Sequence, residues 1–327
     1  MKCVLRIFFA AVATLLLVGC GNECDRCGDA YAYAYDSVVR HNSIYHWRTT
    51  FALDSAERAF IENHNIDRIY IRMFDVALEQ NYETTSPEIV PIATTRFVDT
   101  IPTNCEVVPV AYITIDALRA MHGEEALYAH LIVERMKAMC SYNNCGRIKE
   151  LQLDCDWTQT TRESYATLCS VVKDSLHKED IALSITVRLH QLQEDPPPAN
   201  RAVLMLYNTG ALKEFETHNS ILDINDVKPY IKPMKYPIPL SYAYPFFGWG
   251  VKFKDEEFVA IVSAQDSIHS PEEHIRIERA TYSEIAAVKE FVEGNLGKPQ
   301  GGNILYHLDN TQLKNYTNNE IDKILTY

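Results

Sequence analysis

The sequence contains no cluster of basic residues. Among its 327 residues, 31 are lysine or arginine and 44 are aspartate or glutamate, so the formal net charge is −13. Proteins that bind nucleic acid use grouped lysine and arginine side chains to neutralise phosphates. An acidic chain without such a group therefore argues against nucleic acid as a partner.

Several motifs for cofactors and nucleophiles are also missing. No glycine-rich loop of the GxGxxG or P-loop type follows an apolar run, which argues against a bound nucleotide. No HxH or HExxH spacing suggests a metal centre, and no serine elbow or cysteine–histidine pattern suggests a nucleophile. The sequence therefore predicts neither a cofactor nor a metal.

The apolar run near the N-terminus is too short to span a membrane comfortably. Lys2 and Arg6 precede an apolar stretch over residues 7–18, as in an export signal. The stretch ends in Leu-Val-Gly-Cys20, which resembles a bacterial lipobox, whose cysteine carries the lipid. We therefore predict a membrane anchor through the lipid on Cys20. The expected location is outside the cytoplasm at the outer membrane, on its periplasmic face or at the cell surface.

Three regions follow from this pattern. We predict a lipoprotein signal peptide over residues 1–19, a tether over 20–42 and one folded domain over 43–327.

Cysteines in an oxidising compartment can pair. Cys140 and Cys145 bracket a turn-like SYNN segment, so the sequence favours a local disulfide there.

The folded region alternates between strand-like and helix-like segments. Strand candidates cover residues 43–51, 67–76, 106–115, 148–157, 181–192, 202–210, 238–251 and 302–310. Amphipathic helices separate most of them, and a long polar loop is expected over 79–104. Eight strand-then-helix units predict a single (β/α)8 TIM barrel of the α/β class. A doubly wound open sheet is the alternative, but the phosphate loop typical of that fold is missing.

In a TIM barrel, functional side chains gather at the carboxyl ends of the strands. Carboxylates, arginines, histidines and aromatic residues lie at these predicted ends, and a polar cleft lined with aromatic rings suits a sugar. We therefore expect a glycan or oligosaccharide as the partner. The candidate ligand-contacting residues are Trp47, Arg72, Asp75, Tyr112, Asp154, Asp156, Trp157, Arg188, His190, Tyr207, Asn208, Tyr242, Tyr244, Trp249, His307 and Asp309.

The segment Glu-Leu-Gln-Leu-Asp-Cys-Asp-Trp at 150–157 contains the main catalytic candidates. Side chains two residues apart share one face of a strand, so Asp154 and Asp156 should both point into the barrel mouth. Cys155 should face the helix that carries Cys169. Repulsion from Asp154 should raise the pKa of Asp156 and make it a proton donor, while an arginine keeps Asp154 ionised.

A second carboxylate for chemistry across the cleft could come from Asp75 or Asp309. The alternative to catalysis is a structural network, in which the aspartates at 154 and 156 tie strands together through Arg72, Arg188 or His190. Sequence alone leaves both readings of the acidic pair open.

The fourth and sixth strands resemble those of the family-18 glycoside hydrolases. Aligned on that family's DxxDxDxE motif, Asp154 and Asp156 match its second and third aspartates. Met205-Leu-Tyr207-Asn208 matches its M-x-Y-D/N motif, so the resemblance implies that Tyr207 and Asp156 support a substrate acetamido group. Leu151 replaces the first aspartate, and Thr158 stands where that family has its catalytic glutamate.

The middle third of the chain is also similar to an uncharacterised bacterial barrel family, domain of unknown function 3142, through LQLDCDW, YATLCSVV and LSIT. Two hypotheses follow. The chain is a glycoside hydrolase that uses a rearranged acid, because the hydroxyl of Thr158 cannot replace a carboxylic acid as proton donor. Alternatively, it is a catalytically inactive barrel that binds carbohydrate, or a structural surface lipoprotein.

Overall fold

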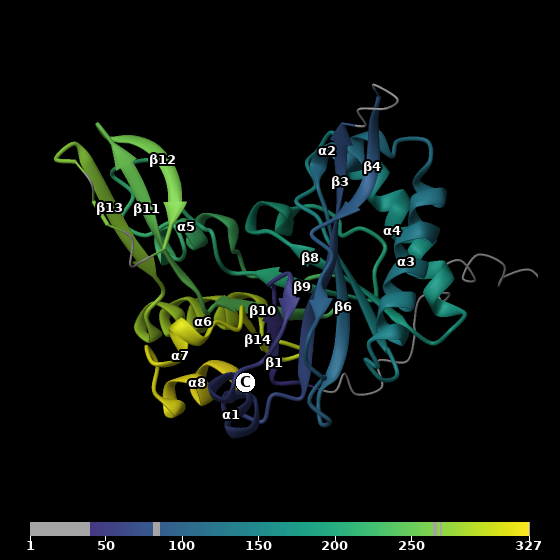
Figure 1. The fold of residues 1–327 in the computed structure, drawn as a ribbon, viewed down its shortest axis with the longest axis horizontal. Helices are drawn as coiled ribbons and strands as arrows, with labels where there is room; N and C mark the ends of the chain where they lie inside the picture. The colour runs from purple at the N-terminus through teal and green to yellow at the C-terminus, as the bar shows by residue number, and fades with distance from the viewer. Residues whose placement is uncertain (1–39, 81–85, 264–266, 269, 327) are drawn as a thin grey trace, which may run out of the picture. The chain divides into compact units, whose positions relative to one another are not determined.

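A computed structural model describes residues 40–80, 86–263, 267–268 and 270–326, and its central feature is a closed barrel of parallel strands (Figure 1). The strands follow one another around the ring in the order β1, β3, β6, β7, β8, β9, β10 and β14. Parallel pairing of β1 with both β3 and β14 closes the ring. The prediction of a (β/α)8 TIM barrel is therefore confirmed.

The barrel strands are largely buried, as expected for parallel strands covered on both faces. They are β1 (Ser43–His46), β3 (Arg68–Gln80), β6 (Glu106–Ile113), β7 (Glu150–Asp154), β8 (Ala182–Val187), β9 (Arg201–Met205), β10 (Leu240–Pro245) and β14 (Asn303–Tyr306). Only β3 extends well beyond the ring, because its last residues pair with an extra antiparallel strand.

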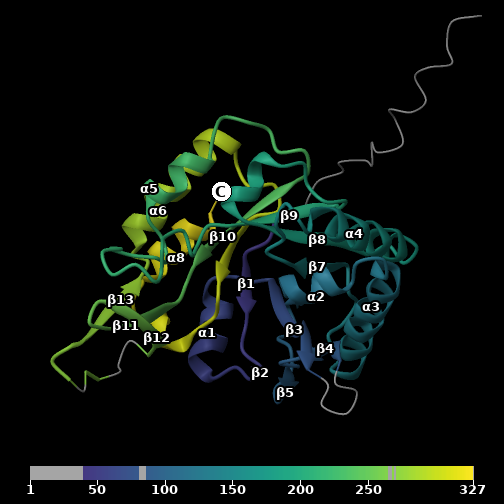
Figure 2. The same cartoon turned by 90° about the horizontal axis from the view of Figure 1, so that it is seen from above.

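Helices surround the strands when the barrel is seen from above (Figure 2). Asp54 begins the first helix with a capping box, in which its side chain accepts from the amides of residues 56 and 57. After β9 the helical segment is only one turn long. The helices are α1 (Ser55–Asn63), α2 (Ile115–Ala120), α3 (Glu125–Tyr142), α4 (Arg162–His177), α5 (Ile224–Val227), α6 (Tyr282–Leu296), α7 (Asn310–Leu313) and α8 (Asn318–Leu325). Among the described residues, the 3-10 helices are η2 (Leu189–Gln193) and η3 (Lys228–Tyr230).

Two regions differ from the sequence prediction. The expected polar loop over 79–104 was wrong, because β4 (Pro87–Ile92) and β5 (Arg96–Phe97) lie within it and pair with β3 and with β2 (Thr50–Phe51). The predicted strand over 238–251 was wrong in its second half, because the barrel strand β10 ends at Pro245 and the chain then enters a three-stranded antiparallel sheet of β11 (Gly248–Lys254), β12 (Glu257–Val262) and β13 (Glu273–Arg279). Figure 1 shows this sheet standing apart from the barrel strands.

The inward face of β7 is polar along its whole length. Glu150, Gln152 and Asp154 alternate with Leu151 and Leu153, and all five side chains are buried. In the middle of the barrel, Gln152 accepts from the hydroxyl of Tyr45 at 2.6 Å and donates to that of Ser184 at 3.3 Å. A buried polar group is tolerated when it is hydrogen-bonded, so this strand carries paired polar groups through the barrel interior.

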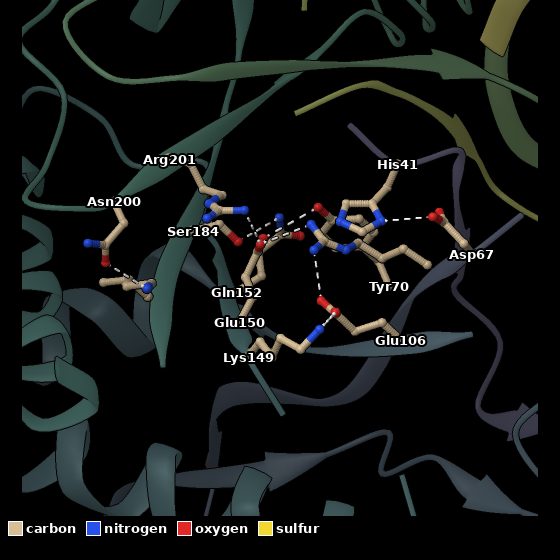
Figure 3. Close-up of polar contacts among 12 residues, drawn as sticks. His41, Asp67, Tyr70, Glu106, Lys149, Glu150, Gln152, Ser184, Asn200 and Arg201 are labelled. Carbon is tan, nitrogen blue, oxygen red and sulfur yellow. Dashed lines mark hydrogen bonds and ion pairs between the residues drawn. The ribbon is translucent and has the colours of Figure 1, made fainter. Parts of the chain in front are cut away.

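A network of charged side chains closes the amino-terminal end of the barrel (Figure 3). Glu150, 1% exposed, accepts from Arg68 at 3.2 Å and from Arg201 at 3.1 Å. Arg68 also donates to Glu106 at 2.7 Å. Each of these four residues is the first of its strand, so we call them the barrel-floor network. Their mutual neutralisation allows charge to be buried there.

The cysteines depart from the prediction in one place. Cys140 and Cys145 are buried free thiols rather than a disulfide. Cys155 follows β7, and burial, with smaller contributions from Asp154, Asp156 and Cys169, raises the pKa of its thiol. Among the helices of the described residues, none is both long and apolar enough to cross a membrane. Cys20 lies outside the described residues.

Candidate functional site

Asp154 occupies the centre of the carboxyl end of the barrel. Its side chain is 2% exposed and accepts a hydrogen bond of 2.6 Å from the Thr186 hydroxyl on β8. Burial, with a smaller contribution from Asp156, raises the pKa of Asp154 to about 6, despite the opposing effects of Arg188 and Thr186. Asp154 is therefore a buried carboxyl group that can be protonated in mildly acidic conditions.

Asp156 lies closer to the outside of the barrel than Asp154 and forms an ion pair with an arginine. The Arg188 guanidinium donates through Nε to Oδ1 of Asp156 and through Nη2 to Oδ2 at 3.3 Å. The Arg188 guanidinium also lies 5.5 Å from the centre of the Tyr207 ring. The predicted division of roles was wrong: the raised pKa belongs to Asp154, because it is buried, and the two-point ion pair with arginine belongs to Asp156.

A pocket of about 310 Å³ opens beside this ion pair. It is formed by the ends of β7, β8 and β9 and by the segment that follows β9. Its lining includes Asp156, Arg188, His190, Tyr207, Asn208 and Tyr230. Asn208 has a φ of 54°, a conformation that asparagine adopts more readily than most residues, and the chain leaves β9 there. The structure thus brings five predicted residues together around one cavity.

A group of packed aromatic rings lies next to the pocket. Tyr207 stacks on Tyr306 with ring centres 4.2 Å apart, and Tyr306 in turn contacts Trp47 at 5.4 Å. Phe247 contacts both Tyr207 and Tyr306 at 5.9 Å. Burial and the charge of Asp154 raise the pKa of Tyr306. These rings form an apolar wall close to the acidic pair.

Arg72 and Asp75 form a second ion pair at the barrel mouth. Arg72 donates through Nε to Asp75 at 2.6 Å, and its guanidinium lies 5.5 Å from the centre of the Trp47 ring. Asp75 is 8% exposed. The charge of Asp75 contributes to raising the pKa of Asp154, so the two acids lie in one electrostatic environment. Asp75 is already paired and serves to fix Arg72 against Trp47.

Four predicted site residues have other positions. Tyr242 and Tyr244 are buried on the helix side of β10: the Tyr242 hydroxyl donates to the Gly297 carbonyl at the end of α6, and Lys289 of α6 lies over the Tyr244 ring. Trp157 is 3% exposed and packs in the core, so it is no sugar platform. Asp309 caps α7 by accepting from the Thr311 amide at 2.9 Å. Tyr242, Tyr244 and Trp157 are thus buried and do not line the pocket, whereas a ligand contact of Asp309 stays a prediction.

The remaining candidates lie on other elements than those that form the pocket. Tyr112 of β6 pairs with Asp154 of β7, and burial, together with Asp156 and Asp154, raises the pKa of Tyr112 to about 12. His307 stacks on Phe247 at 6.0 Å, and burial lowers the pKa of His307. Trp249 lies on β11, outside the barrel ring, and donates from its indole nitrogen to Glu278 at 2.9 Å.

Sequence reasoning missed three residues that shape the site. The Thr186 hydroxyl donates a hydrogen bond to Asp154, Tyr306 stacks on Tyr207, and Tyr230 of η3 lines the pocket. Thr186 of β8 is two residues before Arg188, which directly follows the strand in extended conformation, so alternation could have placed both on the same face. Nothing in the sequence pattern marks Tyr230, because it follows an irregular segment after β9. Within the described ranges, no group of three or more histidine, cysteine, aspartate or glutamate residues is arranged to hold a metal ion.

Comparison with known proteins identifies the fold. No family model matches the chain, and no curated protein matches it. A chitinase from Chromobacterium violaceum superposes with a TM-score of 0.55 at 10% identity, covering 88% of this chain and 100% of that one. A class V chitinase from Nicotiana tobaccum, in complex with NAG4, gives a TM-score of 0.52 at 9% identity over 88% and 99%. A chitinase-like agglutinin from Robinia pseudoacacia gives 0.50 at 11% over 87% and 99%.

These similarities establish a barrel of the chitinase-like type. At such low identity they concern the fold and not the activity. The expected resemblance to family-18 hydrolases therefore holds at the level of architecture, whereas the similarity to domain of unknown function 3142 is not matched by any family model.

Proposed function

We propose that the protein is a glycan-binding barrel, held outside the cytoplasm at the outer membrane through a lipid on Cys20. The fold supports this proposal, because the structural neighbours include chitinases, one of them in complex with NAG4, and a chitinase-like agglutinin. The pocket supports it too, because aromatic rings beside paired polar groups suit a sugar, whose ring stacks while its hydroxyls form hydrogen bonds.

One observation favours binding over hydrolysis. Beyond Asp156, the next residue expected on the inward face is Thr158, and its hydroxyl is engaged with Thr160 at 3.0 Å and Thr161 at 3.3 Å. Asp156 itself is bound at two points by Arg188. A glycoside hydrolase that cleaves by general acid catalysis needs a carboxylic acid within reach of the leaving oxygen. Among the residues that line the pocket, the one carboxylate is already paired with a guanidinium.

A specific observation supports glycoside hydrolysis as the second candidate. Burial raises the pKa of Asp154 to about 6, which is the range in which a carboxyl group donates a proton near neutral pH. In such an enzyme, Asp154 would be the acid, and Asp154→Asn would abolish hydrolysis. A glycan array, followed by incubation of each bound glycan with the protein, separates the candidates: a binder leaves the glycan intact.

Replacement of Asp156 tests the pocket directly. We expect Asp156→Asn to weaken glycan binding by about ten-fold or more, since it removes the charge that orients Arg188. The melting temperature should stay close to that of the wild type, because the Asp156 side chain is 38% exposed and such pairs contribute little to stability. Titration calorimetry with the glycan bound most tightly on the array measures the affinity.

The matched control is Asp99→Asn. Asp99 pairs with Arg58 and its side chain is 30% exposed, but it does not line the pocket. The control should leave glycan affinity unchanged. A large drop in melting temperature for Asp156→Asn with unaltered affinity would show that the pair serves as scaffold.

The membrane anchor has its own test. Cys20→Ala should leave the precursor unprocessed and without incorporated radioactive palmitate, because the lipid attaches to the thiol of that cysteine. Labelling of the variant at the wild-type level would contradict the lipobox assignment. The result does not affect the proposal of glycan binding.

A further inference from the structure

The pocket beside Asp156 contains polar side chains whose hydrogen-bonding groups are not used within the protein. Asn208 and His190 are exposed, and Tyr230 is 40% exposed. None of these three side chains has a hydrogen-bond partner in the part of the chain that the structure describes, yet all three line the same cavity. They are available to a ligand, in contrast to Asp154, which is satisfied by Thr186.

Tyr230 is held at the outer edge of this pocket by its backbone. Gln193, at the end of η2, donates to the Tyr230 carbonyl at 3.1 Å, and Pro229 fixes the chain just before it. The segment that carries Tyr230 is thereby attached to the segment that carries His190. Because the anchoring uses the main chain, the ring of Tyr230 stays available for stacking.

The electrostatic balance of the pocket favours a neutral ligand. Its nine lining residues include one aspartate, one arginine and one histidine, with no lysine or glutamate. The carboxylate of Asp156 and the guanidinium of Arg188 neutralise each other through two hydrogen bonds. The carboxylate of a sugar acid would need a cationic side chain that has no counter-ion of its own. It would also be repelled by the carboxylate of Asp156. Sugar hydroxyls, by contrast, can donate to Asp156 and accept from Arg188.

The size of the pocket limits how much of a glycan it can hold. A volume of about 310 Å³ lies at the small end of the roughly 300–1,000 Å³ range of ligand sites. Such a volume suits one or two sugar rings rather than a longer run of a polymer.

We propose that this pocket recognises the terminal one or two units of a neutral glycan, with Tyr230 as the outer stacking platform and the Asp156–Arg188 pair bonding the sugar hydroxyls. This inference rests on the proposed glycan-binding function and specifies its ligand. Asn208 and His190 supply further hydrogen bonds at the rim. The choice between sugars then depends on the sugar ring that stacks on Tyr230 and on the sugar hydroxyls that hydrogen-bond to the Asp156–Arg188 ion pair.

A length series tests the proposal. Neutral oligomers of N-acetylglucosamine, glucose and mannose, one to six units long, are titrated into the wild-type protein beside oligogalacturonates of the same lengths. For the neutral series that binds, affinity should rise up to two units and then stay constant. Oligogalacturonates should bind at least about ten-fold more weakly. Affinity that keeps increasing up to six units, or preferential binding of the acidic series, would overturn the proposal.

Two tyrosine variants complete the test. Tyr230→Ala should weaken binding of the disaccharide by about ten-fold, because a stacked ring is lost. Tyr142→Ala is the control, since Tyr142 is 87% exposed on α3 and lies outside the pocket lining. Thermal melting of both variants checks that the fold is intact. Equal affinity of Tyr230→Ala and wild type would overturn the role of Tyr230.

Failure of the wild type to bind any glycan on an array overturns both the proposed function and this inference. Glycan binding without the plateau at two units overturns this inference alone.

Discussion

Glu150→Gln is expected to lower the free energy of unfolding by about 3–5 kcal/mol, the range measured when one member of a buried ion pair is removed. Glu150 is 1% exposed and accepts from both Arg68 and Arg201. The variant leaves two guanidinium groups at the barrel floor with one fewer anion. Glu106 alone cannot replace it, since Glu106 is shared between Arg68 and Lys149.

Urea denaturation of Glu150→Gln, compared with Glu134→Gln, measures this effect. Glu134 is a surface residue, 55% exposed, that pairs with Lys137 on α3, and its replacement should change stability by less than about 0.5 kcal/mol. A cost for Glu150→Gln as small as that of the control would show that the barrel-floor network contributes little to stability.

The second large effect concerns Asp154 and depends on pH. Burial raises the pKa of Asp154 from 3.8 to about 6. Between these two values the folded state binds more protons than the unfolded state, so the contribution of Asp154 to stability falls as pH rises. The loss reaches about 3 kcal/mol above pH 6, from about two units of pKa at 1.36 kcal/mol each.

Asp154→Asn removes this pH-dependent cost while keeping an oxygen that can accept from Thr186. The stability of the variant minus that of the wild type should therefore rise from pH 4 to pH 7 by up to about 3 kcal/mol. Denaturant titrations at pH 4, 5, 6 and 7 measure the difference. Asp174→Asn, an exposed site on α4, controls for the loss of a carboxylate as such. A difference that does not change with pH would contradict the assigned environment of Asp154.

Local alternation allowed much of the barrel to be predicted from the sequence. The strand-then-helix order indicated the closed ring, and the two-residue spacing placed Asp154 and Asp156 at the same end of the barrel, where Thr186 and Arg188 donate hydrogen bonds to them. These features depend on neighbours along the chain, which the sequence displays directly.

The predictions that were wrong concern features set by contacts between strands. Leu153 of β7 pairs with Ile185 of β8, and this register sets Thr186 near Asp154 and Arg188 near Asp156. No local pattern contains that register, so the roles of the two acids were exchanged. Tyr242 and Tyr244 share a face, but the rule that functional residues lie at strand ends does not say which face points inward.

The pairing of β1 with β14 has a consequence for how the chain reaches its native state. Ser43 pairs with Ile304, so the two strands that close the ring lie at opposite ends of the folded region. During synthesis, the first strands are complete long before the last one exists, and an unpaired strand edge promotes misassembly and aggregation. Because so many closing contacts are far apart in sequence, folding should be slow. The nascent chain therefore depends on being kept apart from other copies until β14 has emerged.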